Sequence, residues 1–233
     1  MAYVEKNTSS ETRNGAGMSQ DLEYNQRPHI AHAAPVHRQF ANPAPLGLFS
    51  FASTTLILSF FNVQARHITE PNVVVGMALG VGGLCQLLAG MWEFACGNTF
   101  GATAFTSYGG FWLSFGAIFI PGSGILAAFT GPTAGQLHNA LGIYLMAWFI
   151  FTAIMFAGTL RSSFVLSGLF FFLTITFMLL MIGEFTENVT VTKTGGGFGI
   201  LTAAFAFYAA AAGIYTPESG YFVLPVIDLP KRH

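Results

Sequence analysis

The chain alternates between long uncharged apolar stretches and short polar connections. From Pro43 to about Val63 there is no charged residue, and a polar turn with Arg66, His67, Glu70 and Pro71 follows. An apolar run of about 20 residues is what a helix needs to cross the hydrocarbon core of a bilayer. The pattern therefore predicts membrane-spanning helices and an all-α fold.

The longest uncharged stretch, residues 94–160, is too long for one crossing. Gly-rich and Pro-rich segments at residues 97–101 and 121–133 divide it, because such residues mark turns. The glycines at residues 195–197 are expected to shape the start of the last span. The six expected spans are Pro43–Val63, Asn72–Trp92, Phe100–Ile120, Leu137–Ala157, Ser163–Gly183 and Gly195–Tyr215.

Three regions follow from this pattern. Residues 1–41 carry scattered charges with little apolar periodicity and are expected to be a disordered tail. Residues 42–216 form the predicted six-helix transmembrane domain, and residues 217–233 form a second tail. An even number of spans places both tails on one side. Seven basic residues then lie on that side against two on the other, so the positive-inside rule places both termini in the cytoplasm.

Composition supports an integral membrane protein and argues against an enzyme. The chain is 53% hydrophobic and 8% charged, whereas about a quarter of the residues in a soluble domain are charged. Sequence motifs of soluble enzymes and of metal sites are absent, so no catalytic residue, cofactor or metal is predicted. The net charge of −1 gives no reason to expect a nucleic-acid partner.

The segment at residues 42–48 marks the start of the first span. Asn42 is a favourable helix N-cap, and Pro43 is tolerated in a first turn, where its missing N–H needs no partner. A helix N-terminus suits a nearby anion, although an ordinary cap explains the same residues. The Asn-Pro-Ala triplet is also a motif of aquaporins. The aquaporin fold uses two such triplets, however, and this chain has one, which argues against that hypothesis.

Polar residues within or beside the spans are the candidates for function. Glu93, His138 and Glu184 lie near predicted span ends, where they are expected to reach water or headgroups, with a proton relay as the alternative. Deeper polar side chains need partners if they are buried, and we expect some of them to line a pathway. The deeper candidates include Gln86, Thr106, Ser107 and Tyr108.

Gly76 and Gly80 form a small-xxx-small pair. Such a pair allows close packing of two helices, either within one bundle or between subunits. Spacing alone leaves both possibilities open.

Several motifs together resemble those of the acetate uptake transporter family, which groups bacterial succinate–acetate permeases with fungal acetate and ammonia-export proteins. Residues 42–48 read Asn-Pro-Ala-Pro-Leu-Gly-Leu. Residues 97–101, 103–109 and 111–112 form a second block, Gly-Asn-Thr-Phe-Gly, Thr-Ala-Phe-Thr-Ser-Tyr-Gly and Phe-Trp, and residues 158–160 are a weaker third match. The resemblance covers about residues 42–215.

The resemblance implies six helices per subunit, a homo-hexamer with a pore in each subunit, and permeation of small monocarboxylates, often with proton coupling. It also implies a hydrophobic constriction, which falls on Phe51, Tyr108 and Leu173 in this chain. The long N-terminal tail is more similar to that of fungal members, which implies a eukaryotic plasma membrane.

Depth along the predicted helices agrees with that placement. Phe51, Tyr108 and Leu173 lie two to three turns past the cytoplasmic starts of their spans, a rise of roughly 12 to 15 Å. In a core about 30 Å thick these depths are near the midplane, so the three side chains are expected to form one ring.

The leading hypothesis is a transporter or channel for acetate and similar monocarboxylates. Asn42 orients the first span, Gln86, Thr106 and Ser107 are offered as polar lining, and Glu93 is a candidate for proton coupling. One alternative is a channel for ammonia or another small neutral solute. A second is a membrane sensor or scaffold that transports nothing.

Overall fold

The structure is a computed structural model that describes residues 40–218 and 220–230. The predicted tail over residues 1–41 lies almost wholly outside the described residues. The described chain is helical and has one antiparallel β-bridge, between Ser163 and Asp228. Its elements are α2 (Ala44–Asn62), η1 (Ala65–His67), α3 (Val74–Leu79), η2 (Gly80–Cys85), α4 (Gln86–Ala95), α5 (Thr99–Phe119), η3 (Pro121–Ser123), η4 (Leu126–Ala128), η5 (Gly131–Gln136), α6 (Leu137–Thr159), α7 (Phe164–Thr186) and α8 (Val189–Ile214).

Five helical segments of the described chain are long and apolar enough to cross a membrane. They are Ala44–Asn62, Val74–Ala95, Gly131–Thr159, Phe164–Thr186 and Val189–Ile214. The 21-residue helix α5 is long enough but carries many Gly, Ser and Thr residues, which lower its mean hydropathy. The prediction of an all-α polytopic membrane protein is therefore confirmed at the level of five apolar segments.

The start of α8 differs from its predicted position at Gly195. The helix begins at Val189, because Asn188 accepts hydrogen bonds from the backbone N–H groups of Thr190 and Val191 at 2.9 and 3.3 Å. The glycines at residues 195–197 thus lie inside the helix, and the expectation that they shape its start is wrong. Gly196 instead allows close approach, since a Cβ there would lie 2.8 Å from the Asn62 side chain of α2.

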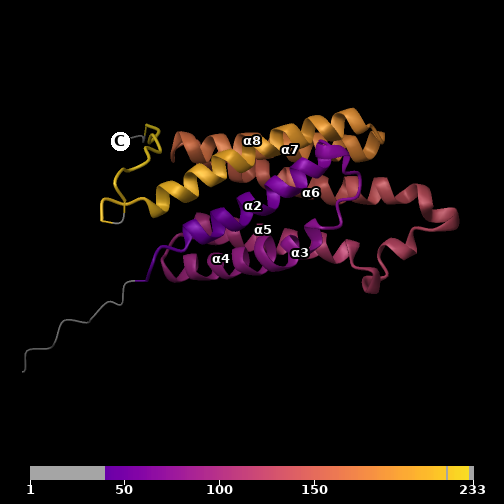
Figure 1. The fold of residues 1–233 in the computed structure, drawn as a ribbon, viewed down its shortest axis with the longest axis horizontal. Coiled ribbons are helices and arrows are strands. Elements are labelled where there is room, and N and C mark those ends of the chain that lie inside the picture. Colours follow the sequence, from indigo (N-terminus) through magenta and orange to yellow (C-terminus); the bar gives the residue numbers. More distant parts are fainter. Residues whose placement is uncertain (1–39, 219, 231–233) are drawn as a thin grey trace, which may run out of the picture. The chain divides into compact units, whose positions relative to one another are not determined.

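Helix α2 lies centrally in the described bundle. Figure 1 shows α2 running between α7 and α8 on one side and α3 and α4 on the other, and its backbone packs closely against α8 and α4. Helices α6, α7 and α8 pack side by side in chain order, as do α4 and α5. By contrast, α5 meets α6 and α7 mainly through aromatic side chains, so a layer of rings fills the space between these helices.

The second span contains a π-helical segment, η2, between α3 and α4. No proline causes it. Gly82 faces α2 there, and a Cβ would lie 2.7 Å from the Thr54 Oγ1 atom, so only glycine fits. A π segment adds a residue to one turn and changes the direction of every side chain that follows it.

The small residues of this span serve two different surfaces. Gly90 packs closely against Thr106 of α5, where a Cβ would lie 2.5 Å from the Thr106 backbone nitrogen. Gly76 and Gly80 have open space at their Cβ positions. The Gly76–Gly80 pair is therefore not used for packing within the described chain.

The segment after α8 folds back onto the start of α7. The backbone N–H of Phe164 donates to the Ile227 carbonyl at 2.8 Å, and the N–H of Leu229 donates to the Ser162 carbonyl at 3.0 Å. The Tyr208 hydroxyl also donates to the Pro225 carbonyl at 2.8 Å. These bonds attach the segment to the end of the bundle at which α7 begins.

Candidate functional site

Cavities follow one another along α2, from its N-terminal end to its C-terminal end. The first cavity, about 180 Å³, lies beside Ala44 and Leu48 at the start of the helix. The second, about 90 Å³, lies beside Thr55 and Ser59 in its later turns. The third, about 370 Å³, opens beside Asn62 at its end. The three cavities thus lie one after another along α2.

Phe51 separates the first two cavities. Its ring lines both, whereas Tyr108 lines only the first and Leu173 only the second. Phe51, Tyr108 and Leu173 are 4%, 2% and 3% exposed and belong to one core cluster. The structure thus brings together the three residues that the sequence predicts to form a ring.

Tyr108 is held by contacts from three helices. Its hydroxyl is 2.8 Å from the Thr152 hydroxyl of α6. Its ring centroid is 5.6 Å from that of Phe51 on α2, and it stacks on Phe177 of α7 at 6.5 Å. A buried phenol needs a polar partner, and Thr152 supplies one while the ring remains among apolar groups.

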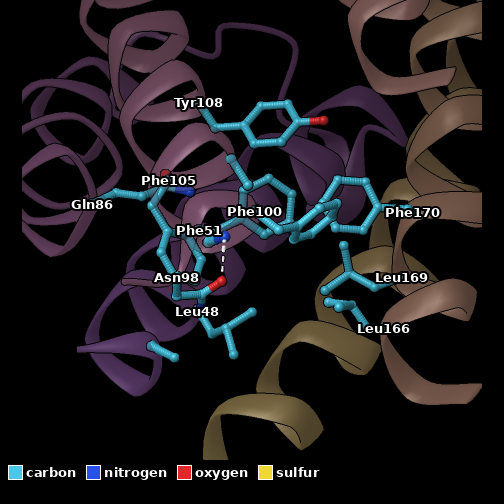
Figure 2. A pocket seen from close by; sticks show the side chains of 13 residues that line it. Leu48, Phe51, Gln86, Asn98, Phe100, Phe105, Tyr108, Leu166, Leu169 and Phe170 are labelled. Carbon is cyan, nitrogen blue, oxygen red and sulfur yellow. Dashed lines mark hydrogen bonds between the residues drawn. The ribbon is translucent and has the colours of Figure 1, made fainter. Parts of the chain in front are cut away.

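The first cavity is mostly apolar, with polar side chains at one side. Figure 2 shows Phe51, Phe100, Phe170 and leucines of α2 and α7 around it, with Gln86 and Asn98 at its edge. Gln86 is 1% exposed, and its Oε1 atom has no hydrogen-bond partner in the described chain. A buried amide oxygen without a partner is costly, so this atom is available to a donor on a solute.

The π segment explains how Gln86 comes to line the cavity. Gln86 directly follows η2, so the extra residue in that turn sets the direction of its side chain. Asn98 has a different origin. It caps α5 and accepts a hydrogen bond from the Gly101 backbone N–H at 3.0 Å (Figure 2).

The second and third cavities are joined by polar residues. Asn62, Glu184 and Thr192 line both. The Glu184 Oε2 atom lies 2.8 Å from the His138 Nδ1 atom, and His138 and Glu187 also line the third cavity. No Lys or Arg is among the residues that line the three cavities in the described chain.

Four predicted site residues, Asn42, Glu93, Thr106 and Ser107, are not among the residues that line the three cavities. Asn42 is exposed, and its side-chain oxygen accepts from the Ala44 N–H at 3.0 Å, so it supports the helix start one residue before the observed N-cap, Pro43. Thr106 packs against Gly90, and neither Thr106 nor Ser107 is among the residues that line the three cavities.

Glu93 differs from the expectation that it reaches water or headgroups. The side chain is 2% exposed, because α4 continues to Ala95 and the chain then turns into α5, whose first turn packs against Glu93. The carboxyl group lies against Gly101 and the Asn98 side chain, and its Oε1 atom has no hydrogen-bond partner in the described chain. Asn98 and Gly101 line the first cavity, whereas Glu93 is not among its lining residues.

Sequence reasoning missed much of the surroundings of Tyr108. Thr152, Trp148 and Phe177 all contact it, yet they stand in apolar helices among many similar residues. The polar Thr152 in the middle of an uncharged span was the available signal. A hydroxyl at that position is consistent with a partner on another helix.

Comparison with known proteins gives consistent matches. Residues 24–231 match the GPR1/FUN34/yaaH family. The chain is 53% identical over 199 residues to the ammonia transport outward protein 2 of Saccharomyces cerevisiae, covering 85% of this chain and 70% of that protein. It is 50% identical over 202 residues to acetate permease A of Emericella nidulans, covering 83% and 68%.

The match to bacterial relatives covers nearly the whole length of those proteins. The succinate-acetate/proton symporter SatP of Escherichia coli K12 is 41% identical over 188 residues, covering 81% of this chain and 96% of that protein. The structure of the bacterial acetate channel SatP superposes with a TM-score of 0.71 at 40% identity, covering 81% of this chain and 99% of the other.

Proposed function

The chain belongs to the GPR1/FUN34/yaaH family, and on that premise we propose that it is a membrane transporter or channel for acetate and similar small monocarboxylates. The observation that carries the proposal is the series of cavities along α2, interrupted at Phe51. Relatives named as an acetate permease, an acetate channel and a succinate-acetate/proton symporter support the choice of solute.

Phe51, Tyr108 and Leu173 form the proposed constriction. The Phe51 ring is the shared wall of two cavities, and the other two side chains close the space on either side of it. A constriction of buried apolar groups can exclude water and still admit a small solute. The Tyr108 hydroxyl is the one polar group in the trio, and it is the proposed contact for the carboxyl group of the solute.

Polar side chains near the first cavity have separate proposed roles. Gln86 contributes an unpartnered amide oxygen, which accepts hydrogen bonds, and is the proposed contact for the O–H group of the protonated acid in this cavity. Asn42 holds the start of α2 by its bond to Ala44. The positions of Thr106 and Ser107 suit helix packing between α4 and α5 better than a lining role.

The proposed arrangement in the membrane has six crossings. Helix α5 is the sixth, because its 21 residues span about 31 Å and it lies within the bundle. Both tails, residues 1–41 and 217–233, are placed in the cytoplasm of a plasma-membrane protein by the positive-inside rule. Open positions at Gly76 and Gly80 are compatible with contact between subunits, and the proposed assembly is a homo-hexamer.

A channel for ammonia or another small neutral solute is the second candidate. It is favoured by the name of the yeast relative, ammonia transport outward protein 2, and by the fact that no Lys or Arg of the described residues lines the three cavities. The carboxylate-specific proposal instead rests on the bacterial and Emericella relatives. One experiment separates the two.

The experiment measures solute flux in vesicles that contain the purified protein. Labelled acetate, water and ammonia are compared with protein-free vesicles, and a variant with Phe51 and Tyr108 replaced by alanine serves as the control. Acetate flux above background that changes in the variant supports the proposal. Acetate flux equal to that of protein-free vesicles would overturn it, with ammonia flux then favouring the second candidate. If neither solute moves, the sensor or scaffold hypothesis gains.

A further inference from the structure

The third cavity holds a titratable pair that the constriction does not use. The His138 Nδ1 atom of α6 is 2.8 Å from the Glu184 Oε2 atom of α7. The side chains are 48% and 26% exposed, so both reach water at the end of the bundle opposite the start of α2. Glu184 also lines the second cavity and is the one carboxylate among its lining residues.

We propose that the His138–Glu184 pair is a proton-exchange site that converts an incoming carboxylate into the neutral acid before it reaches Phe51. This inference rests on the proposed function and adds to it the chemical form of the solute and the group that supplies the proton. The position of Glu184 at the junction of two cavities is the basis of the argument.

The lining beyond the junction favours a neutral solute. Most residues that line the second cavity are apolar, such as Phe51, Phe111 and Leu173, and its polar lining residues other than Glu184 are uncharged. No Lys or Arg of the described chain lines the first or second cavity. Moving a carboxylate into such surroundings without a cation is costly, and the usual response is to take up a proton. The solute therefore has to gain its proton before it reaches the constriction. Glu184 lies on that part of the path, at the junction of the second and third cavities.

The proton step balances without any further reactant. The O–H bond of the protonated Glu184 carboxyl group breaks, and an O–H bond forms on the acetate oxygen, so the total charge of the two groups stays at one negative charge. Water at the third cavity then returns a proton to Glu184, directly or through His138. No electron transfer is involved.

The position of the two residues on their helices makes the pair suitable for exchange. His138 is the second residue of α6, near the positive end of that helix, and Glu184 lies in the last turn of α7, near its negative end. Both side chains are partly exposed at these helix ends, so both can exchange protons with water.

Other charged groups at this end have different positions. Glu187 lines the third cavity on the exposed turn after α7. Arg66, His67 and Glu70 in the connection after α2, and Lys193 on α8, are exposed and are not among the lining residues of this cavity. Glu70 thus provides a control for Glu184, since it is an exposed carboxylate at the same end that does not itself line the cavity, although its neighbours Thr69 and Pro71 do.

The test measures exchange of labelled acetate in vesicles of full-length protein, with the same pH inside and outside so that orientation does not matter. Protein-free vesicles are subtracted at each pH from 5 to 7.5. The free acid has a pKa close to that of a side-chain carboxyl group, about 4, so less of it is protonated as the pH rises. The Glu184→Gln variant should therefore approach the unsubstituted protein at pH 5 and fall at least tenfold below it at pH 7.5.

The outcomes separate this inference from the proposed function. A Glu184→Gln profile parallel to that of Glu70→Gln, or a deficit equal at every pH, would overturn the inference while leaving acetate transport in place. No acetate exchange by the unsubstituted protein would overturn the proposed function and this inference with it. If Glu184→Gln does not fold, His138→Gln decides, because a proton-exchange role predicts a changed pH profile and an unchanged profile rejects it.

Discussion

The Tyr108 hydroxyl on α5 is hydrogen-bonded to the Thr152 hydroxyl on α6, at 2.8 Å, directly beside Phe51. This bond joins two helices that otherwise meet mainly through aromatic rings. It also fixes the direction of the phenol at the proposed constriction. Substituting each partner in turn therefore distinguishes the structural role of the Tyr108 hydroxyl group from its proposed role in transport.

Tyr108→Phe and Thr152→Val should have similar effects on stability and different effects on transport. Each removes one partner of a buried hydrogen bond, so each should lower the free energy of unfolding by about 1 kcal/mol. Only Tyr108→Phe removes the group proposed to contact the solute, so acetate flux should fall several-fold in that variant alone. Thermal unfolding and vesicle flux measure the two effects, and equal flux in both variants would reject the contact.

Leu173→Val should broaden the range of solutes. The side chain is buried at the second cavity beside Phe51, so losing one methylene group enlarges the proposed constriction. Larger acids such as lactate or succinate should then gain flux relative to acetate, at a stability cost of about 1 kcal/mol. Competition by unlabelled acids against labelled acetate gives the measurement.

Leu169→Val is the matched control for that change. Leu169 is equally buried on the same helix but lines only the first cavity. Its variant should keep the original solute range. A broadened range in both variants would show that packing in general, and not the constriction, sets solute size.

Gln86→Leu should keep or raise stability while lowering acetate flux. The substitution removes a buried amide oxygen that has no partner, so the folded state loses a desolvation cost of about 1 to 3 kcal/mol. It also removes the proposed solute contact in the first cavity.

Thr54→Val is the comparison for Gln86→Leu. Thr54 is fully buried nearby, but its hydroxyl donates to the Ser50 carbonyl within its own helix and is not among the residues that line the cavities. Its variant should leave flux unchanged. A Gln86→Leu protein that unfolds at a lower temperature yet transports normally would contradict both parts of the prediction.

Gly90→Ala and Gly76→Ala should act in opposite directions on a single subunit. A methyl group on Gly90 would meet the backbone nitrogen of Thr106 at 2.5 Å, which cannot move without shifting α5, so stability should fall by about 1 to 3 kcal/mol. Gly76 has open space and should gain helix propensity of up to about 1 kcal/mol. Unfolding temperatures check both, and size-exclusion chromatography shows whether Gly76→Ala alters assembly.

Most helix positions could be predicted, because charged residues and turn residues mark the ends of the helices. The first span is expected at Pro43–Val63 and found at Ala44–Asn62, and the fourth begins at Leu137 as expected. The start of α8 was misplaced because three consecutive glycines usually mark a turn, whereas here close packing against α2 requires one of them inside a helix.

The candidate site was predictable only in part. Depth arithmetic and family motifs together placed Phe51, Tyr108 and Leu173 at one level, and their role as a constriction stays a prediction. The π segment contains no proline or other clear sequence signal. The direction of the Gln86 side chain therefore could not be derived from the period of a regular α-helix. Burial of Glu93 depends on how tightly the chain turns into α5, which spacing along the sequence does not encode.

Because Phe51 forms the wall between two cavities, a solute on the proposed pathway passes a wide section, a narrow section and another wide section in sequence. The narrowest section then limits the flux, and widening a section that is already wide changes the flux very little. Substitutions in these wider sections should therefore change the flux little, except at residues such as Gln86 and Glu184 that are proposed to contact the solute or to exchange its proton. A small change in the mobility of the single Phe51 ring would scale the rate for every solute that passes.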